Sequence, residues 1–206
     1  MAALRLGVLV SGGGTSLQNF LDREKAGTLA GEVALVVSSD PAARAVERAG
    51  DAGKPCAVVP WNREEGPGPF SAAITRELEK AKVDLVLMAG FLKLYQFPGA
   101  FAGRVMNIHP ALLPAFGGQG MYGIHVHSAV VKSGTKVTGC TVHFADLAYD
   151  RGPVILQRTC PVLYEDTPQT VAARVFALEK EAYPEAVSLF ARGKLRIEGR
   201  RVRVLD

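Results

Sequence analysis

The fold is indicated by residues 4–25, which read LRLGVLVSGGGTSLQNFLDREK. Leu4–Val10 is a short apolar run and is predicted to form a buried strand. A glycine-rich turn follows at Ser11–Ser16, and Ser16–Lys25 is predicted to form a helix. A strand that passes through a tight turn into a helix is typical of the first unit of a parallel α/β sheet.

The same alternation continues along the chain and predicts right-handed β-α-β units. The further predicted strands are Val33–Ser38, Cys56–Pro60, Asp84–Ala89, Val105–His109, Thr138–Ala145 and Val154–Val162. The further predicted helices run from Asp40-Pro41 to about Ala52, over Phe70–Lys82, over His125–Lys132, and from Thr167-Pro168 to about Tyr183, where Pro184 is expected to break or restart the helix. Loops are predicted over residues 61–69 and 110–124, and a terminal hairpin over Leu195–Leu205 with Glu198-Gly199 as its turn.

The predicted fold class is therefore α/β, with three layers. A mostly parallel, twisted sheet of about seven strands carries helices on both faces. With 206 residues, the chain is expected to form one domain over 1–206. Its two halves would be a Rossmann-like half, 1–103, and a second half, 104–206, and no linker composition separates them.

Composition narrows the function classes. The three cysteines have no CxxC spacing, which disfavours a disulfide framework or a zinc ribbon and favours a cytoplasmic protein. No signal-peptide pattern or apolar run long enough to span a membrane is present, so no membrane partner is expected. The net charge is +4, and many of the cations lie near the C-terminus. Since no aromatic platform accompanies them, a solvated hairpin is favoured over a nucleic-acid surface.

The Ser11–Ser16 turn is a candidate anion site. Glycines let the backbone approach a ligand, and the N-terminus of a helix offers free N–H groups. Leu17 stands where a dinucleotide fingerprint would need its third glycine, and no Gly-Lys-Ser/Thr follows. Phosphate binding and a purely structural turn are both open from this motif alone.

Asn107, His109 and Asp150 are the candidate catalytic residues. Alternation along Val105–His109 puts Asn107 and His109 on one face of a strand, at the end where open α/β sheets bind ligands. An amide N–H can stabilise an oxyanion, and an imidazole can also move a proton. A carboxylate at Asp150 would raise the pKa of His109 and keep it charged. Asp146 is a rival carboxylate that spacing alone does not separate from Asp150.

The other histidines and the cysteines receive structural interpretations. His143 is expected to be a hydrogen-bonded residue beneath the site. His125 and His127 could suggest a metal pair, but residues two apart near a helix start diverge, so no metal is expected. Cys140 and Cys160 fall in apolar strands and are expected to be buried and unreactive. No G-x-S-x-G elbow supports a serine hydrolase.

At these residues the chain resembles the folate-dependent formyltransferases, and among them the phosphoribosylglycinamide formyltransferases of purine synthesis. The resemblance covers nearly the whole length. It is carried by the Ser11–Ser16 turn, by Ala89-Gly90-Phe91-Leu92, by Asn107-Ile108-His109-Pro110-Ala111-Leu112-Leu113-Pro114, by residues 118–123 and 139–144, and by Asp150-Arg151-Gly152-Pro153-Val154-Ile155.

The resemblance implies an activity and a set of site residues. The implied reaction moves a formyl group from 10-formyltetrahydrofolate to the amine of glycinamide ribonucleotide, in a monomer or a homodimer. Asn107, His109 and Asp150 match the catalytic trio of the family. The implied substrate contacts are Gly14, Thr15 and Ser16 at the phosphate and Phe176, Ala177, Leu178 and Glu179 near the ribose. The implied folate contacts are Leu92, Lys93, Leu94, Tyr95, Asn107, Asp146, Leu147, Ala148, Tyr149 and Asp150.

Four positions depart from the pattern of the family. Ser16 stands where Asn is usual, Arg63 falls out of register with a folate-contacting Arg, Lys93 replaces Arg, and Arg151 follows the catalytic Asp. Two related enzymes are alternatives. A methionyl-tRNA formyltransferase would be expected to carry a further C-terminal domain, and a formyltetrahydrofolate hydrolase an added N-terminal one. A non-catalytic nucleotide-binding module would keep the glycine turn but would not need the trio.

Overall fold

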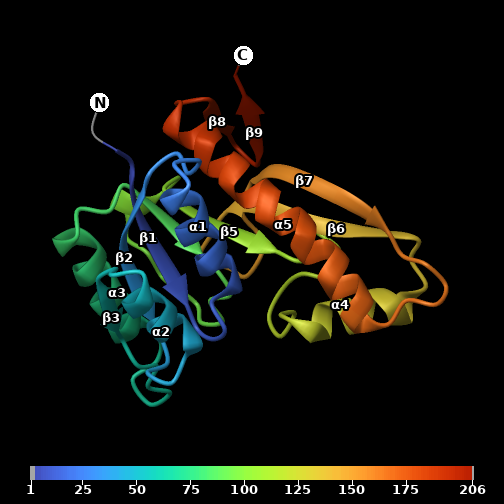
Figure 1. Ribbon diagram of the computed structural model, residues 1–206, viewed down its shortest axis with the longest axis horizontal. Coiled ribbons are helices and arrows are strands. Elements are labelled where there is room, and N and C mark those ends of the chain that lie inside the picture. Colours follow the sequence, from blue (N-terminus) through green and yellow to red (C-terminus); the bar gives the residue numbers. More distant parts are fainter. Residues whose placement is uncertain (1–2, 206) are drawn as a thin grey trace. The chain divides into compact units, whose positions relative to one another are not determined.

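The computed structural model describes residues 3–205, which divide into two compact units, one up to Met106 and one from Asn107 (Figure 1). In the first unit, four parallel strands lie in the order β3-β2-β1-β4. Their bounds are β1 Arg5–Val10, β2 Glu32–Ser38, β3 Cys56–Val58 and β4 Leu85–Met88. The helices of this unit are α1 Thr15–Lys25, α2 Arg44–Asp51, α3 Pro67–Lys80 and a short 3₁₀ turn, η1 Gly99–Phe101.

The central strands of this unit are buried on both faces. All residues of β1 after Arg5 are buried, and so are the last four residues of β2. A strand whose successive residues are all buried must be covered on both sides, because alternate side chains point to opposite faces. This burial confirms the prediction that helices cover both faces of the sheet.

The second unit is a mixed sheet with two helices. Strand β6 (Val137–Phe144) pairs antiparallel with β7 (Val154–Pro161), β7 pairs parallel with β9 (Arg201–Val204), and β9 pairs antiparallel with β8 (Leu195–Glu198). Helix α5 (Pro168–Ala191) packs against β6, β7 and α4 (Ile124–Ser133) (Figure 1). Strand β5 (Val105–His109) leads into this unit and has the predicted bounds.

The predicted α/β class with a mostly parallel sheet is confirmed. The strands of the described residues number nine rather than about seven. The terminal hairpin accounts for the difference, because β9 pairs with β7 and thereby extends the sheet instead of standing apart from it. No helix within residues 3–205 combines the length and the apolar character needed to cross a membrane.

Helices α1 and α4 begin one residue before their predicted starts, and two other helices begin three residues from theirs. Helix α2 begins at Arg44, because Asp40 uses its carboxylate to accept the Ala42 N–H in a turn at 2.9 Å instead of capping the helix. Helix α3 begins at Pro67, inside the predicted loop, with Gly66 before it. Proline is compatible with a first helical turn, since its missing N–H would have no partner there.

The predicted break at Pro184 is wrong. Helix α5 is continuous for 24 residues and passes through Pro184, although proline there removes one backbone donor. Tyr183, Pro184 and Val187 are all buried on this stretch. Burial of apolar side chains against the sheet therefore outweighs the lost hydrogen bond.

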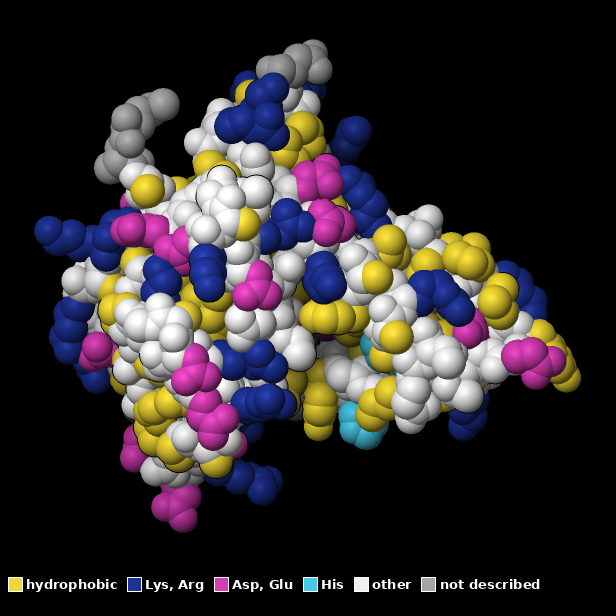
Figure 2. Space-filling view, viewed as in Figure 1, with side chains coloured by type: hydrophobic (Ala, Val, Ile, Leu, Met, Phe, Trp, Pro, Cys, Tyr) yellow, Lys and Arg dark blue, Asp and Glu magenta, His cyan; other side chains and the backbone are white. Residues whose placement is uncertain are grey.

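The basic C-terminal hairpin is solvated, as expected. Figure 2 shows Lys and Arg side chains spread over this end of the molecule. The side chains of Arg196 and Arg203 are 71% and 65% exposed, and both lie near Glu198, at 3.5 and 3.3 Å. Such exposed pairs contribute little to stability.

Candidate active site

Strand β5 delivers two polar side chains to one place. Asn107 and His109 alternate with Met106 and Ile108, so both point to the same side of the strand. Asn107 is half-buried, and His109 is only 3% exposed. Buried polar groups need partners, and both residues find them within the second unit.

His109 lies between a backbone carbonyl and a carboxylate. Its Nε2 is 2.8 Å from the carbonyl oxygen of Phe116, and its Nδ1 is 3.5 Å from Asp150 Oδ2. Because a carbonyl can only accept, Nε2 must carry a proton and donate it. In the neutral ring, Nδ1 is therefore left as a free base that faces Asp150.

Asp150 accepts hydrogen bonds from Gly118 and Asn107 and lies close to His143. Its Oδ2 accepts the Gly118 N–H at 2.9 Å, and its Oδ1 lies 3.4 Å from the amide nitrogen of Asn107 and 3.7 Å from His143 Nε2. The Asp150 backbone is left-handed, with φ of 55°. Asp tolerates this conformation better than most residues, and it turns the carboxylate into the cluster.

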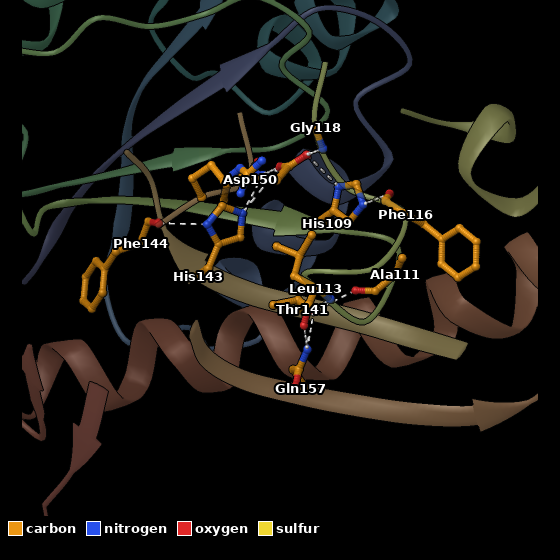
Figure 3. A network of polar contacts seen from close by, with 12 residues as sticks. His109, Ala111, Leu113, Phe116, Gly118, Thr141, His143, Phe144, Asp150 and Gln157 are labelled. Atoms are coloured by element: carbon orange, nitrogen blue, oxygen red, sulfur yellow. Dashed lines mark hydrogen bonds and ion pairs between the residues drawn. The ribbon is translucent and has the colours of Figure 1, made fainter. Parts of the chain in front are cut away.

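His143 accepts a hydrogen bond from Asn107 and thereby orients its amide. The ring donates from Nδ1 to the Phe144 carbonyl at 2.8 Å, so Nε2 is the acceptor for the Asn107 amide at 3.1 Å (Figure 3). The residue is 2% exposed. The structural interpretation of His143 is confirmed by this geometry.

Burial and charge act in opposite directions on the pair. For His109, burial lowers the pKa, while Asp150 and the Phe116 carbonyl raise it, and the net direction is downward. For Asp150, burial raises the pKa, but the neighbouring His143 and His109 rings and the Gly118 N–H together bring it below its usual range. The lowered pKa of His109 does not favour the expected charged ring in the ligand-free protein, since desolvation outweighs the neighbouring carboxylate.

The choice between the two carboxylates is decided by position. Asp150 contacts His109 and has a side chain that is 10% exposed. Asp146 is exposed, and its carboxylate accepts the Leu147 N–H in its own turn. Of these two carboxylates, only that of Asp150 lies close enough to act on His109.

A polar network that the sequence did not reveal holds the loop after β5. Thr141 Oγ1 donates to the Ala111 carbonyl at 2.7 Å and accepts the Leu113 N–H at 3.0 Å. Gln157 Nε2 donates to the Leu113 carbonyl at 3.0 Å and to Thr141 Oγ1 at 2.9 Å (Figure 3). The signal that could have pointed to Thr141 is its position two residues before His143, on the same face of the strand.

In the first unit, the carbonyl groups of the glycine turn are held by hydrogen bonds and the N-terminus of α1 is left without a side-chain cap. The three glycine carbonyls are occupied: the Ala45 N–H donates to Gly12 at 3.1 Å, Arg48 Nε to Gly13 at 2.9 Å, and the Gln18 N–H to Gly14 at 2.9 Å. Helix α1 has no side-chain cap, so the first N–H groups, at Thr15 and Ser16, remain available.

Gly14 is required by close packing. Its φ is 68°, and a Cβ there would lie 2.7 Å from the Cβ of Ala45. A larger residue would separate the turn from α2. This contact explains the glycine independently of ligand binding, and it places α2 against the turn.

The predicted folate segment 92–95 is mixed in exposure. Leu92 is 43% exposed, and its N–H donates to Ser11 Oγ at 3.0 Å. Tyr95 is 1% exposed, its hydroxyl is 2.9 Å from Thr75 Oγ1, and burial raises its pKa to about 12. The side chain of Tyr95 is therefore buried and already hydrogen-bonded, and it is not exposed for contact with a ligand. In the other predicted folate segment, Asp146, Leu147 and Ala148 are exposed and Tyr149 is half-buried.

The predicted ribose segment lies on α5. Ala177 is exposed, and Phe176, Leu178 and Glu179 are half-buried. Burial raises the pKa of Glu179 to about 7. Glu179 also raises the pKa of Cys140, which burial alone already shifts upward.

The remaining predicted positions take separate surroundings. His125 is exposed and packs edge-on against Tyr122 at 5.3 Å, while His127 is buried. Cys140 and Cys160 are buried, as expected. Of the departures from the family pattern, Lys93 lies over the Trp61 ring at 5.4 Å, the Arg151 carbonyl accepts from Arg200 at 3.0 Å, and Arg63 is exposed.

A family model described as formyl transferase matches residues 4–187. The chain belongs to the formyl transferase family. A phosphoribosylglycinamide formyltransferase of Arabidopsis thaliana, described as chloroplastic, is 39% identical over 195 residues, which cover 93% of this chain and 67% of the relative. The corresponding protein of Vigna unguiculata is 40% identical over 185 residues, which cover 89% of this chain but only 59% of the relative.

Solved structures of the family agree with this assignment. The crystal structure of glycinamide ribonucleotide transformylase 1 from Symbiobacterium toebii superposes with a TM-score of 0.89 at 44% identity, over 98% of this chain and 94% of that one. The resemblance to phosphoribosylglycinamide formyltransferases that the motifs indicated is thus confirmed.

Proposed function

We propose that the chain transfers the formyl group of 10-formyltetrahydrofolate to the primary amine of glycinamide ribonucleotide, as a step of purine biosynthesis. The observation that carries the proposal is the cluster in which Asp150 contacts both Asn107 and His109 in a member of this family. The relatives named above support the choice of substrates.

The chemistry requires no nucleophile from the protein. The substrate amine attacks the formyl carbon, a C–N bond forms, and the carbonyl oxygen becomes an oxyanion. The bond to the folate nitrogen then breaks as that nitrogen receives a proton, and the amine has lost one. The protein must therefore stabilise negative charge on oxygen and carry a proton between two nitrogens.

Asn107 is the proposed oxyanion donor. One of its amide hydrogens is fixed on His143 at 3.1 Å, and the other points to Asp150 over a long 3.4 Å contact. That weak contact can be exchanged for a stronger one to an oxyanion. Loss of such a donor typically raises a barrier by about 2.7–4 kcal/mol.

His109 is the proposed proton carrier. Its lowered pKa leaves the ring neutral near neutral pH, and the Phe116 carbonyl fixes the proton on Nε2. Nδ1 can then take the proton released by the amine, and the resulting imidazolium stabilises the oxyanion. The same proton passes to the folate nitrogen as the intermediate collapses.

Asp150 is proposed to hold the ring and to stabilise it when charged. Its carboxylate is ionised, because its pKa lies below the usual range, and it faces Nδ1. It would also orient water for the proton transfer. This division of roles, with a base whose second nitrogen is fixed and a carboxylate beside it, is common in acid–base catalysis.

The remaining predicted residues would bind the substrates. Gly14, Thr15 and Ser16 would hold the phosphate, and residues 176–179 the ribose. Residues 92–95 and 146–150 would contact the pterin of 10-formyltetrahydrofolate. Fixing two reactants together can lower a barrier by roughly 7–11 kcal/mol.

The single-domain organisation, the cytoplasmic location and the choice between monomer and homodimer also stay predictions.

The experiment that tests the proposal incubates the purified chain with both substrates and follows the absorbance of the folate. We expect release of tetrahydrofolate that depends on glycinamide ribonucleotide, with formylated ribonucleotide formed in equal amount. Folate release at the same rate without the ribonucleotide would instead indicate a hydrolase and would overturn the proposal.

A further inference from the structure

The loop between β5 and α4 supplies both backbone contacts to the catalytic pair. The Phe116 carbonyl fixes the proton on His109, and the Gly118 N–H binds Asp150. Gly117 lies between them, and a Cβ there would be 2.5 Å from Leu113 Cδ2 and 3.3 Å from the Cβ of Asp150. The loop backbone at Gly117 is therefore packed closely against both Leu113 and Asp150. A shift of the loop near Leu113 would change the position of Asp150.

The loop is anchored by a fully satisfied hydrogen-bond network. The Thr141 hydroxyl donates once, to Ala111, and accepts twice, from Leu113 and Gln157, which exhausts its capacity. Gln157 uses both amide hydrogens, one on Thr141 and one on the Leu113 carbonyl. Such networks gain strength from completeness, so removal of one member weakens the others.

Gln157 is the unusual member of this network. Thr141 is fully buried on β6, whereas Gln157 is an exposed residue directly opposite it on β7. An exposed amide at this place contributes little to core packing. Its side chain nevertheless reaches the same loop segment that continues to Phe116 and Gly118 (Figure 3).

We infer that Gln157 is a positioning residue for formyl transfer, which acts through Thr141 and the loop 111–118 to fix the tautomer of His109 and the orientation of Asp150. This inference rests on the proposed function. Gln157 does not touch the reacting groups. It keeps the Phe116 carbonyl and the Gly118 N–H at hydrogen-bond distance from them.

The test compares Gln157→Met, which keeps the length of the side chain but cannot donate, with Thr159→Ala. Thr159 is the matched control, because it is exposed on the same strand and face and lies opposite Gly139, outside the network. We expect kcat of Gln157→Met to fall by about ten- to a hundredfold, as for a small misplacement of catalytic groups, with KM for both substrates within about twofold. Thr159→Ala is expected to match the wild type.

A second readout needs no substrate. The ring ¹⁵N shifts of His109 report its tautomer, and we expect a single Nε2–H form in the wild type and in Thr159→Ala. Gln157→Met should show a mixture of tautomers and faster exchange of the Gly118 amide. Gln157→Glu, which keeps the shape but loses both donors, should behave in the same way. Thr141→Ser keeps the hydroxyl and should stay near the wild type.

The outcomes separate this inference from the proposed function. A wild-type chain that does not formylate glycinamide ribonucleotide overturns the function, while the ring spectra still decide the role of Gln157 in the loop. Unchanged ring spectra in both Gln157 variants overturn the inference. So does a kcat of Gln157→Met that equals that of Thr159→Ala in an active enzyme.

Discussion

At the residue scale, each polar side chain of the site has a hydrogen-bond partner outside the catalytic trio that fixes one of its atoms. His109 is defined by the carbonyl at Nε2, Asn107 by the imidazole of His143, and Asp150 by the Gly118 N–H. Each partner fixes one atom and leaves the other for chemistry. The assignment of roles therefore follows from hydrogen-bond geometry more than from residue type.

Asp150→Asn is expected to lower kcat by about 10²- to 10⁴-fold, the usual range for loss of an acid–base group, with KM for both substrates little changed. The amide cannot balance the charge that forms on His109. Steady-state kinetics with each substrate varied in turn measures this split. Near-normal turnover in the variant would remove Asp150 from the mechanism.

Ser16→Ala is expected to raise KM for the ribonucleotide about tenfold or more, because it removes a hydroxyl proposed to donate to the phosphate, and a hydrogen bond to a charged group is worth about 1.5–3 kcal/mol. KM for the folate should change much less, because Ser16 lies at the start of α1 beside the glycine turn. The two KM values, measured on one preparation, provide the comparison. A larger effect on the folate would contradict the phosphate assignment.

The shared face of Asn107 and His109 could be predicted from the sequence, whereas their carboxylate partner could not. Alternation along Val105–His109 predicted that Asn107 and His109 share a face, because the side-chain period of a strand is fixed by its geometry. Spacing could not choose between Asp146 and Asp150, which share one irregular loop. The direction in which the pKa of His109 shifts could not be predicted either, because desolvation depends on burial in the folded chain.

At the element scale, α2 shapes the glycine turn of the first unit. Ala45 and Arg48 together bind the Gly12 and Gly13 carbonyls, and Arg48 Nη1 also donates to Gln18 on α1 at 2.7 Å. With its carbonyls already bound, the turn would present its N–H groups to the proposed phosphate. Arg48 also adds a positive charge close to this place.

Arg48→Ala is expected to raise KM for the ribonucleotide by about two- to tenfold, as for loss of one ordinary hydrogen bond, with KM for the folate unchanged. Arg44→Ala is the matched control, because Arg44 is exposed on the same helix and carries the same charge. Initial-rate kinetics of both variants gives the result. An equal rise in the KM for the ribonucleotide in both variants would show that charge alone, without contact to the turn, sets the affinity. An unchanged KM in Arg48→Ala would contradict the prediction.

Elements with strong patterns were predicted well, and their ends were predicted less well. The buried strands and the terminal hairpin follow from apolar runs and turn residues. The starts of α2 and α3 were missed because Asp and Pro fit a turn as well as a helix start. In the structure, Asp40 closes a turn and Pro67 begins a helix. The continuity of α5 at Pro184 depended on tertiary packing, which local sequence does not encode.

At the scale of the whole molecule, buried titratable groups link stability to pH. Burial lowers the pKa of His109 and of His127 below the ordinary 6.5. The unfolded chain then binds more protons than the folded one below about pH 6.5, so the free energy of unfolding falls as the pH falls through this range. Glu179 acts in the opposite sense, because its pKa is raised from 4.5 to about 7 in the folded protein. Between these pH values the folded protein binds more protons than the unfolded chain, so this group lowers the free energy of unfolding as the pH rises.

In the Glu179→Gln variant, the free energy of unfolding is expected to decrease steadily from pH 7.5 to pH 5.5, since only the histidine effect remains in that window. Urea denaturation at several pH values measures it. The variant should also gain stability relative to the wild type as the pH rises from about 4.5 to 7. A difference that does not vary with pH would mean that Glu179 is ionised normally in the folded protein.

The central claim is that His109 and Asp150 act as one catalytic pair in formyl transfer. The decisive measurement is the single-turnover rate of transfer for the wild type, His109→Gln, Asp150→Asn and the double variant, with both substrates saturating. We expect each single variant to be slowed severely and the double variant to be about as slow as the slower single one, as for residues that act as a unit. Rate losses that simply multiply in the double variant would contradict it.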